Sequence, residues 1–210
     1  MLRLLLYRSP AELFGSTIST ATIRPRELGD LVGCELAERA EERLFAVALP
    51  TLGTIVDNGS LAVAAQYEGN PYPRWLAFDR PDAGSARAEL APRFAALELA
   101  FMASPYRVLV AGCGTGREAI TFAIRHAPGD RVLGIDLSSA SLAWAARMAQ
   151  RYSVANLDLA RADLLDLGDT GAPFAVIAAS GVLHHMGDPI GGWRALVARL
   201  APGGLMAIGL

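Results

Sequence analysis

Three glycines at alternate positions directly follow a short apolar run, and an acidic residue stands downstream of them. The run begins at Val108, and the glycines are Gly112, Gly114 and Gly116. Glycine lets a backbone turn sharply and approach a ligand closely, and the free amides that begin the next helix favour polar or anionic groups. Asp136 stands 20 residues after Gly116, at the end of a second apolar run. A carboxylate at that offset is suited to binding the two hydroxyls of a nucleoside ribose.

The glycine spacing distinguishes two kinds of nucleotide-binding turn. Turns that bind dinucleotides follow G-x-G-x-x-G, which would place the third glycine at position 117. That position holds Arg117, and the glycine stands at Gly116 instead. One glycine-rich turn is a weak signal, so its meaning depends on the segments that follow.

Alternating strands and helices are predicted around these residues. Buried-strand patterns begin at 108 and cover 131–135, 156–160, 174–180 and 205–210. The run at 174–180 is almost continuously apolar, which is typical of a strand buried on both faces of a parallel sheet. Asp188 and Pro189 predict the start of a helix that includes Leu200 and that Pro202-Gly203-Gly204 stops.

Five segments share their order and spacing with one enzyme family: AGCGTG (111–116), GIDLS (134–138), RADLLDL (161–167), GVLHHM (181–186) and LAPGGL (200–205). Over about residues 104–210, the chain resembles class I S-adenosylmethionine-dependent methyltransferases. The resemblance implies an α/β, Rossmann-like, mostly parallel sheet with helices on both faces. It also implies S-adenosylmethionine as the cofactor and methyl transfer as the activity.

The resemblance also implies roles for single residues. The three glycines would line the methionine portion of the cofactor, and Asp136 would bind the ribose hydroxyls. Leu137 would cover one face of the adenine, and Asp163 would bind the adenine amino group, with Leu164 beside it in the cofactor site. An ionised carboxylate that accepts two hydroxyl protons makes strong, charge-assisted hydrogen bonds, which agrees with the role of Asp136.

One position departs from the family pattern. The family often has an acidic residue at the end of the first strand, where this chain has Val110 and Ala111. Recognition of the ammonium group of the cofactor would then depend on backbone carbonyls or on Ser180. The methyl group would pass in line from the sulfonium to a nucleophile, so that positioning and exclusion of water do most of the work.

His184 and His185 follow the predicted strand at 174–180, where open α/β sheets bind ligands. With an ordinary pKa near 6.5, a histidine there, or Asp188, could take a proton from the acceptor. Alternatively, one histidine supports the turn while the other is polar lining. Adjacent histidines do not easily bind one metal ion together and no third ligand is suitably spaced, so we expect no metal site.

The segment QYEGNPYPRW (66–75) is similar to the lead segment of a bacterial subgroup of methyltransferase-domain proteins. Its prolines predict an extended conformation over 70–75. Tyr72, Arg74 and Trp75 could form a lid over the cofactor cleft and contact the substrate. Alternatively, they clamp the extended segment onto the catalytic domain.

Residues 1–90 are predicted to form a helical and extended N-terminal region, and residues 91–210 the cofactor-binding domain. Residues 35–48 predict an amphipathic helix that ends before Pro50. Residues 79–85 resemble a linker, and a further helix is predicted from Pro92. The residues expected on the apolar side of the first helix are Ala37, Ala40, Leu44 and Val47.

Composition limits the possible partners and the location. A net charge of −2 without a long basic run argues against binding to duplex nucleic acid. The 2 cysteines provide no disulfide framework, so a reducing cytoplasm is expected. No stretch has the roughly 20 apolar residues that a spanning helix needs, and the apolar run of MLRLLLYR is too short for a signal peptide.

The predicted fold has two further strands after 205–210, yet the sequence stops at Leu210. We therefore expect a fragment of a longer protein, and self-association through the exposed terminal strand is a consequence to test.

The methyl acceptor is expected to be a small molecule, because the segment after 174–180 lacks the Asp/Asn-Pro-Pro-aromatic pattern of enzymes that methylate amines of bases or glutamine amides. Two alternatives remain. The chain could be a cofactor-binding or interaction module without enzyme activity, or an NAD(P)-dependent oxidoreductase. The missing glycine at 117 and the segment RADLLDL count against the oxidoreductase.

Overall fold

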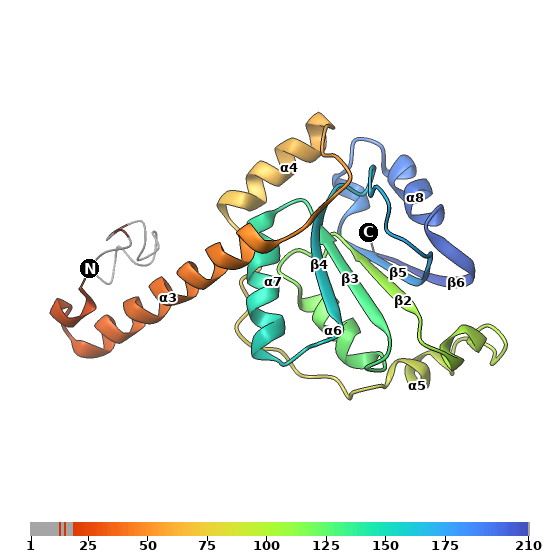
Figure 1. Cartoon of the computed structure of the whole chain (residues 1–210), viewed down its shortest axis with the longest axis horizontal. Helices are drawn as coiled ribbons and strands as arrows, with labels where there is room; N and C mark the ends of the chain where they lie inside the picture. The colour runs from red at the N-terminus through yellow and green to blue at the C-terminus, as the bar shows by residue number, and fades with distance from the viewer. Residues whose placement is uncertain (1–12, 14, 16–18, 210) are drawn as a thin grey trace.

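A six-stranded, all-parallel sheet forms the centre of the computed structural model, which describes residues 13, 15 and 19–209 (Figure 1). The strand order is β1-β4-β3-β2-β5-β6. The strands are β1 (Thr51–Leu52), β2 (Arg107–Ala111), β3 (Arg131–Asp136), β4 (Leu157–Ala162), β5 (Phe174–Ser180) and β6 (Leu200–Gly209). From β2 the chain first builds outward through β3 and β4 and then returns to place β5 on the other side of β2. The Rossmann-like α/β fold predicted from the sequence is confirmed.

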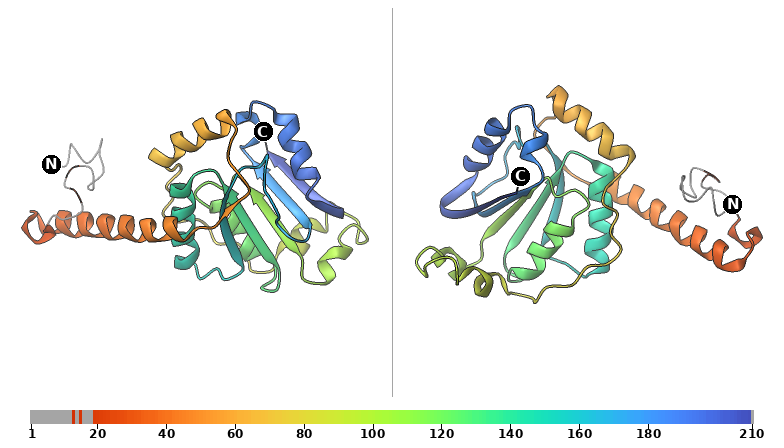
Figure 2. Two further views of the ribbon diagram at one scale, coloured as in Figure 1. Left: turned by 45° about the horizontal axis from the view of Figure 1, so that its top comes forward. Right: turned by 180° about the vertical axis from the view of Figure 1, so that it is seen from behind.

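Helices cover both faces of this sheet, and alternate residues of β2 serve the two faces. Val108 and Val110 pack with α6 (Arg117–Arg125) and α7 (Ser139–Arg151), which lie in front of the sheet when the molecule is seen from behind (Figure 2, right). Leu109 and Ala111 belong to the second core cluster, which contains Leu196 of α8 (Pro189–Val197). Because β5 is buried on both faces, its continuous apolar run is explained.

The start of α8 is as predicted, but its end is not. The carboxylate of Asp188 accepts a hydrogen bond from the N–H of Gly191 at 2.8 Å and caps the helix, with Pro189 in its first turn. The helix then ends at Val197, and Leu200 is already the first residue of β6, paired with Phe174. Pro202-Gly203-Gly204 does not stop the helix, because it lies inside β6, where the register with β5 shifts.

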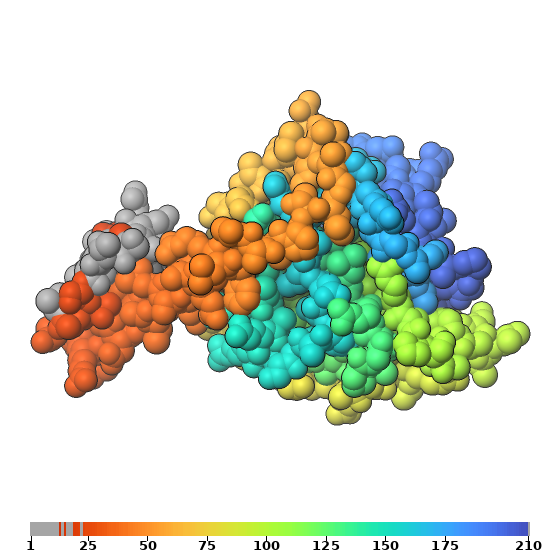
Figure 3. Space-filling view, viewed as in Figure 1, coloured from red at the N-terminus to blue at the C-terminus, as the bar shows by residue number. Residues whose placement is uncertain are grey.

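The N-terminal region is joined to the sheet. Helix α3 (Arg26–Ala48) begins earlier than the helix predicted at 35–48 and leads directly into β1. Strand β1 pairs with β4, and the N–H of Arg161 donates to the carbonyl of Pro50 at 2.8 Å. The half of α3 nearer the N-terminus stands away from the rest of the molecule (Figure 3).

The predicted apolar side of α3 is wrong. Ala37, Ala40, Leu44 and Val47 are exposed, and the exposed fraction of Val47 reaches 89%. The helix instead packs on α7 through its charged side, where Glu42 is buried. The physical reason is a set of arginines from elsewhere in the chain that pair with these glutamates.

Between β1 and β2 the structure confirms one predicted segment in part and corrects another. Helix α4 (Asn58–Gly69) is followed by a stretch over 70–75 that is not helical, as the prolines predict, but it bends at residues 70 and 72 and is not fully extended. The helix predicted from Pro92 is wrong, because α5 (Ala86–Leu90) precedes that residue and only turns and a short 3₁₀ helix (Ala100–Ala103) follow it. One of these turns is closed by Glu98, whose carboxylate accepts from the N–H of Ala95 at 2.7 Å.

Two predicted segments extend beyond the described residues. The opening MLRLLLYR lies outside them, and so does Leu210 at the end of the predicted terminal strand. Within the described part of the chain, no helix has the length and apolar character required to cross a membrane.

Candidate functional site

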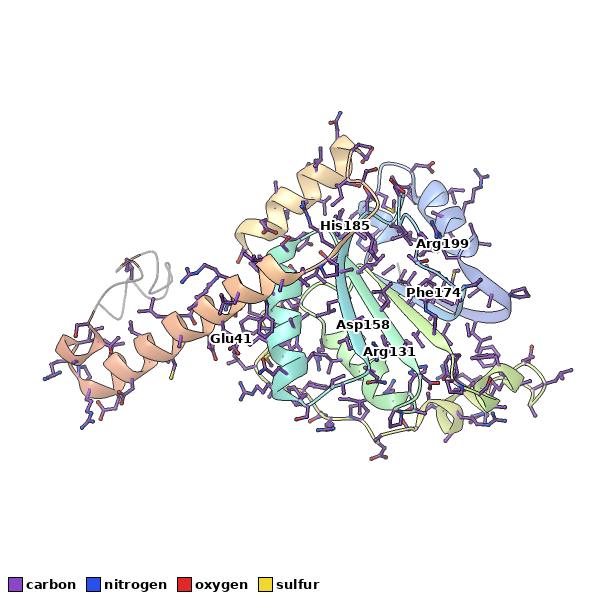
Figure 4. All side chains as sticks on the ribbon, in the orientation of Figure 1. Glu41, Arg131, Asp158, Phe174, His185 and Arg199 are labelled. Carbon is purple, nitrogen blue, oxygen red and sulfur yellow. The ribbon has the colours of Figure 1, made fainter. Side chains whose placement is uncertain are left out.

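A cavity of about 610 Å³ opens where β2, β3 and β5 end. Its walls come from the glycine turn after β2, from the segments after β3, β4 and β5, and from α4. This is the point at which the strand order reverses, and open α/β sheets bind ligands there. In Figure 4, His185 marks this end of the sheet near α4, whereas the ion pair of Arg131 with Asp158 lies toward the opposite end.

The glycine turn needs glycine for geometric reasons. Gly112 and Gly116 have φ values of +65° and +84°, which side chains rarely tolerate. A Cβ on Gly112 would stand 2.1 Å from Val182, and one on Gly116 would stand 2.4 Å from Ala145 of α7. A Cβ on Gly114 would meet nothing within 4 Å, and this residue lines the cavity. Gly112 and Gly116 are therefore packed closely against Val182 and α7, whereas Gly114 is open toward the cavity.

Asp136 lies at the end of β3 and lines the same cavity. Its two carboxylate oxygens accept hydrogen bonds from the N–H of Gly114 at 2.8 Å and the N–H of Ser138 at 2.9 Å. Burial raises the pKa of the Asp136 carboxyl above its ordinary value of 3.8, and the two amide hydrogen bonds oppose the shift. Each carboxylate oxygen can accept further hydrogen bonds, so two hydroxyls of a ribose fit this donor set.

The residues predicted to surround the adenine meet at the cavity. Leu137, Asp163 and Leu164 all line it. Asp163 is only 3% exposed, and one of its oxygens accepts from the N–H of Leu165 at 2.9 Å. A half-satisfied buried carboxylate between apolar side chains is suited to an amino group on an otherwise flat apolar ring.

The predicted ammonium-binding residue, Ser180, is already engaged. Its hydroxyl donates to a carboxylate oxygen of Glu118 at 2.8 Å, and both residues line the cavity. Sequence reasoning missed Glu118. The only available signal was an acidic residue in the first turn of the helix after the glycine turn, where an acidic side chain also stabilises the helix dipole.

The two predicted histidines lie differently with respect to the cavity. His185 lines the cavity, as does Asp188, and His184 is not among the lining residues. Both histidines are exposed, and their rings lie 4.0 Å apart. In the part of the chain that the structure describes, no group of three or more His, Cys, Asp or Glu residues is arranged to hold a metal ion.

The segment with Tyr72, Arg74 and Trp75 is tied to the glycine turn. The indole N–H of Trp75 donates to the carbonyl of Thr115 at 3.0 Å, and the Thr115 hydroxyl donates to the carbonyl of Pro73 at 2.7 Å. Trp75 is buried, whereas Tyr72 is 71% exposed and lines the cavity. The contacts of Trp75 favour the clamp, and the position of Tyr72 is compatible with a lid.

Arg74 is not among the residues that line the cavity, and it belongs to an ion-pair cluster. Its guanidinium lies 3.1 Å from the Glu42 carboxylate and 4.2 Å from the ring centre of Trp144. The buried Arg147 of α7 lies on the same ring at 4.5 Å and bonds Glu42 at 3.1 Å. These contacts hold α3 and the extended segment against α7.

Helix α4 forms one wall of the cavity, which the sequence did not predict. The side chain of Glu68 accepts from the Ser138 hydroxyl at 3.1 Å and from the N–H of Ala140 at 3.2 Å, at the start of α7. The residues of α4 and its cap that line the cavity are Asp57, Gly59, Ser60, Val63 and Tyr67. The long sequence separation from the glycine turn explains why no local pattern revealed this wall.

Cys113 lies inside the glycine turn and is buried. Burial first, and then the charge of Asp136, raise the pKa of its thiol well above the ordinary value, so the thiol stays protonated at neutral pH. This supports a packing role, because only a thiolate is strongly nucleophilic.

The fold and this cavity define a class of protein: an α/β domain that binds a nucleoside-containing cofactor at the carboxyl ends of parallel strands. Residues 109–206 match a family model described as a methyltransferase domain. This match agrees with the class of enzyme predicted from the sequence, a methyltransferase, over that segment.

Known proteins extend the likeness beyond that segment. An uncharacterized protein of a Synechococcus species is 34% identical over 168 residues, which cover 78% of this chain and 38% of the relative. The chain thus spans less than two fifths of the length of that relative. The cyclase SpnF is 22% identical, covers 75% of this chain and 62% of its own, and has a TM-score of 0.51. A methyltransferase from Geobacter sulfurreducens, solved with S-adenosylhomocysteine, is 26% identical with a TM-score of 0.44 over 63% of this chain and 50% of its own.

Proposed function

We propose that the whole protein transfers a methyl group from S-adenosylmethionine to a small-molecule acceptor. The observation that carries the proposal is the cavity in which the glycine turn, Asp136 and Asp163 meet inside a methyltransferase domain. Its volume of about 610 Å³ lies within the range of small-molecule sites. We place the acceptor beside α4 and the segment after β5, which line the rest of the cavity.

The residues of this chain would act mainly by binding and positioning. Bound S-adenosylmethionine supplies a methyl group that is activated by the positive charge of its sulfonium. Asp136 and Asp163 fix the nucleoside end, and the open side of the glycine turn accommodates the methionine end. Val63, Tyr67 and Tyr72 line the cavity, and with the cofactor and acceptor bound they would help to exclude water, which favours in-line transfer to a nucleophile held nearby.

Two of the predicted candidate bases, His185 and Asp188, line the cavity, and the carboxylate of Asp188 is engaged in capping α8. His185 lines the cavity and is exposed, so a neutral imidazole can accept a proton and release it to solvent. We propose His185 for this step, with His184 supporting the orientation of its ring.

Three further parts of the proposal concern the subgroup, the location and the partner. We also propose that the lead segment at 66–75 places the chain in a bacterial subgroup of such proteins, and its contacts with Thr115 hold this segment beside the glycine turn. A cytoplasmic location is supported by the two free cysteines. The lack of a long basic run in the sequence supports a partner other than duplex nucleic acid.

Isothermal titration with S-adenosylhomocysteine and with NAD, followed by a methyl-transfer assay, tests the function. We expect measurable binding of S-adenosylhomocysteine and no heat with NAD. Tight binding of NAD alone would favour the oxidoreductase. Cofactor binding without methyl transfer to any acceptor would favour the module without enzyme activity, an outcome that the shared fold of the cyclase SpnF keeps open.

A further inference from the structure

The carboxylates of the cofactor cavity fall into two kinds according to their hydrogen bonds. Within the described residues, 5 carboxylates line the cavity. Four of them accept hydrogen bonds from backbone amides, and these are Asp57, Asp136, Asp163 and Asp188. Their geometry is fixed by the turns and helix starts that they close. The fifth, Glu118, is bonded instead to the hydroxyl of Ser180.

Glu118 lies over the beginning of the glycine turn. It is the second residue of α6, and its carboxylate reaches the last residue of β5. Strands β2 and β5 pair as far as Val110 opposite Ala178, and Ser180 at the end of β5 lines the same cavity as Gly112. The charge of Glu118 also contributes, after burial and Asp136, to the raised pKa of the Cys113 thiol. The carboxylate is therefore close to the turn and open to the cavity.

The free acceptor capacity of Glu118 matches a cationic donor. A carboxylate can accept about four hydrogen bonds, and Ser180 provides one. The strand that leads into the turn ends in Val110 and Ala111, which carry no charge. A ligand whose amino-acid end lies on the glycine turn brings an ammonium group to this place, where a half-buried carboxylate would make a charge-assisted hydrogen bond.

We propose that Glu118, oriented by Ser180, binds the ammonium group at the methionine end of the cofactor and makes the site selective for a ligand with an amino-acid end. The proposal rests on the proposed function. It assigns the negative charge to the helix after the glycine turn rather than to the strand before it.

The experiment compares two ligands on two variants by isothermal titration. S-adenosylhomocysteine carries the ammonium, whereas methylthioadenosine keeps the adenosine and the sulfur but lacks the amino-acid end. Glu118→Gln preserves the size of the side chain and removes its charge. We expect this variant to bind S-adenosylhomocysteine about tenfold to a hundredfold more weakly, because one charge-assisted hydrogen bond is lost. Its affinity for methylthioadenosine should stay within about twofold of the wild-type affinity. Glu41→Gln, on α3 and away from the cavity, should change neither affinity (Figure 4).

Other outcomes would overturn the proposal. Equal weakening of both ligands would mean that Glu118 acts on the adenosine end or on the fold, and thermal unfolding of the variant would identify a fold defect. Unchanged binding of both ligands would show that the ammonium binds elsewhere. If the unmodified protein bound neither ligand, the proposed function and this proposal would both fail, whereas tight wild-type binding with an insensitive variant would overturn this proposal alone.

Discussion

Asp136 combines two tasks that a single carboxylate can perform together. Its hydrogen bonds from Gly114 and Ser138 tie the end of β3 to the glycine turn, and its remaining acceptor positions face the cavity. The same side chain thereby shapes the turn and, in the proposed function, holds the ribose.

Replacing Asp136 should test this double role. We expect Asp136→Ala to weaken the binding of S-adenosylhomocysteine by roughly tenfold to a few hundredfold, because charge-assisted hydrogen bonds contribute about 1.5 to 3 kcal/mol each. The measurement is isothermal titration of a variant shown to be folded by circular dichroism. Asp158→Ala, which removes an exposed carboxylate paired with Arg131 at the other end of the sheet, is the matched control. An unchanged affinity in folded Asp136→Ala would show that this residue does not bind the ribose.

The raised pKa of Asp136 predicts a pH dependence with a definite sign. Its carboxyl keeps a proton to a higher pH in the folded protein than in the unfolded chain. Between the two pKa values the folded state binds more protons, so the stability contribution of this group falls as the pH rises above about 3.8. Binding of hydroxyls needs the ionised carboxylate, so the affinity for S-adenosylhomocysteine should increase over the same interval. Titrations between acidic and neutral pH measure this, and a slope retained in Asp136→Ala would assign it to another group.

At the scale of single residues, the sequence predicted the carboxylates that directly follow strands, Asp136 and Asp163. It did not predict Glu118, whose side chain bonds a residue at the end of another strand. Asp136 and Asp163 stand directly after apolar runs, so their position at the cavity follows from strand direction alone. The partner of Glu118 is 62 residues away in the chain. That pairing depends on the register of β2 and β5, which no local pattern contains.

At the scale of elements, α3 shows how tertiary contacts can override an amphipathic pattern. Its aliphatic side faces solvent, because its glutamates find partners in Arg74 and Arg147 on the other side. The two arginines also lie against the ring of Trp144, which shields the ion pairs from water. A sequence pattern weighs each residue by its own polarity and cannot include such partners.

Removing one buried partner should therefore loosen α3. We expect Glu42→Ala to lower the free energy of unfolding by about 1.5 to 3 kcal/mol, because the buried Arg147 loses one of its two carboxylate partners and keeps Glu38. Urea unfolding followed by circular dichroism measures the change. The matched control is Glu41→Ala, one residue away and less buried, which should cost well under 1 kcal/mol. Equal effects of the two changes would contradict the assignment of the buried cluster.

Two substitutions in the segment after α4 can test its clamp role and its lid role separately. Trp75→Ala should destabilise the protein by about 3 to 5 kcal/mol, because the ring is buried against Phe78 and Tyr152 and its N–H is bonded to Thr115. Tyr72→Ala should leave thermal stability nearly unchanged, since its side chain is mostly exposed. If Tyr72 covers the acceptor, its loss should raise KM for the acceptor with little change in cofactor affinity. If Tyr72→Ala kept the wild-type KM for the acceptor, Tyr72 would not act as a lid, and the segment would serve only as a clamp.

At the scale of the whole molecule, the N-terminal region and the segment that matches a methyltransferase domain share a sheet and a cavity. Strand β1 adds to the edge of the sheet beside β4, and α4 provides a wall of the site. The sequence could not predict β1, because a strand of 2 residues has no periodicity to detect. The division at residue 90 remains a prediction from composition, as does self-association through β6, which light scattering would detect.

This shared architecture predicts a single cooperative unfolding transition. The buried Trp75 and Trp144 belong to opposite sides of the division at residue 90, and they pack in one cluster with the helices α6 and α7. Fluorescence of the tryptophans and the circular dichroism of the whole chain should therefore change at the same urea concentration. S-adenosylhomocysteine should move both curves together to higher urea, because a ligand that binds only the folded state stabilises everything that unfolds with its site. Two separated transitions, of which the ligand shifts only one, would show that α3, β1 and α4 fold apart from the sheet and that the α4 wall is not a fixed part of the cavity.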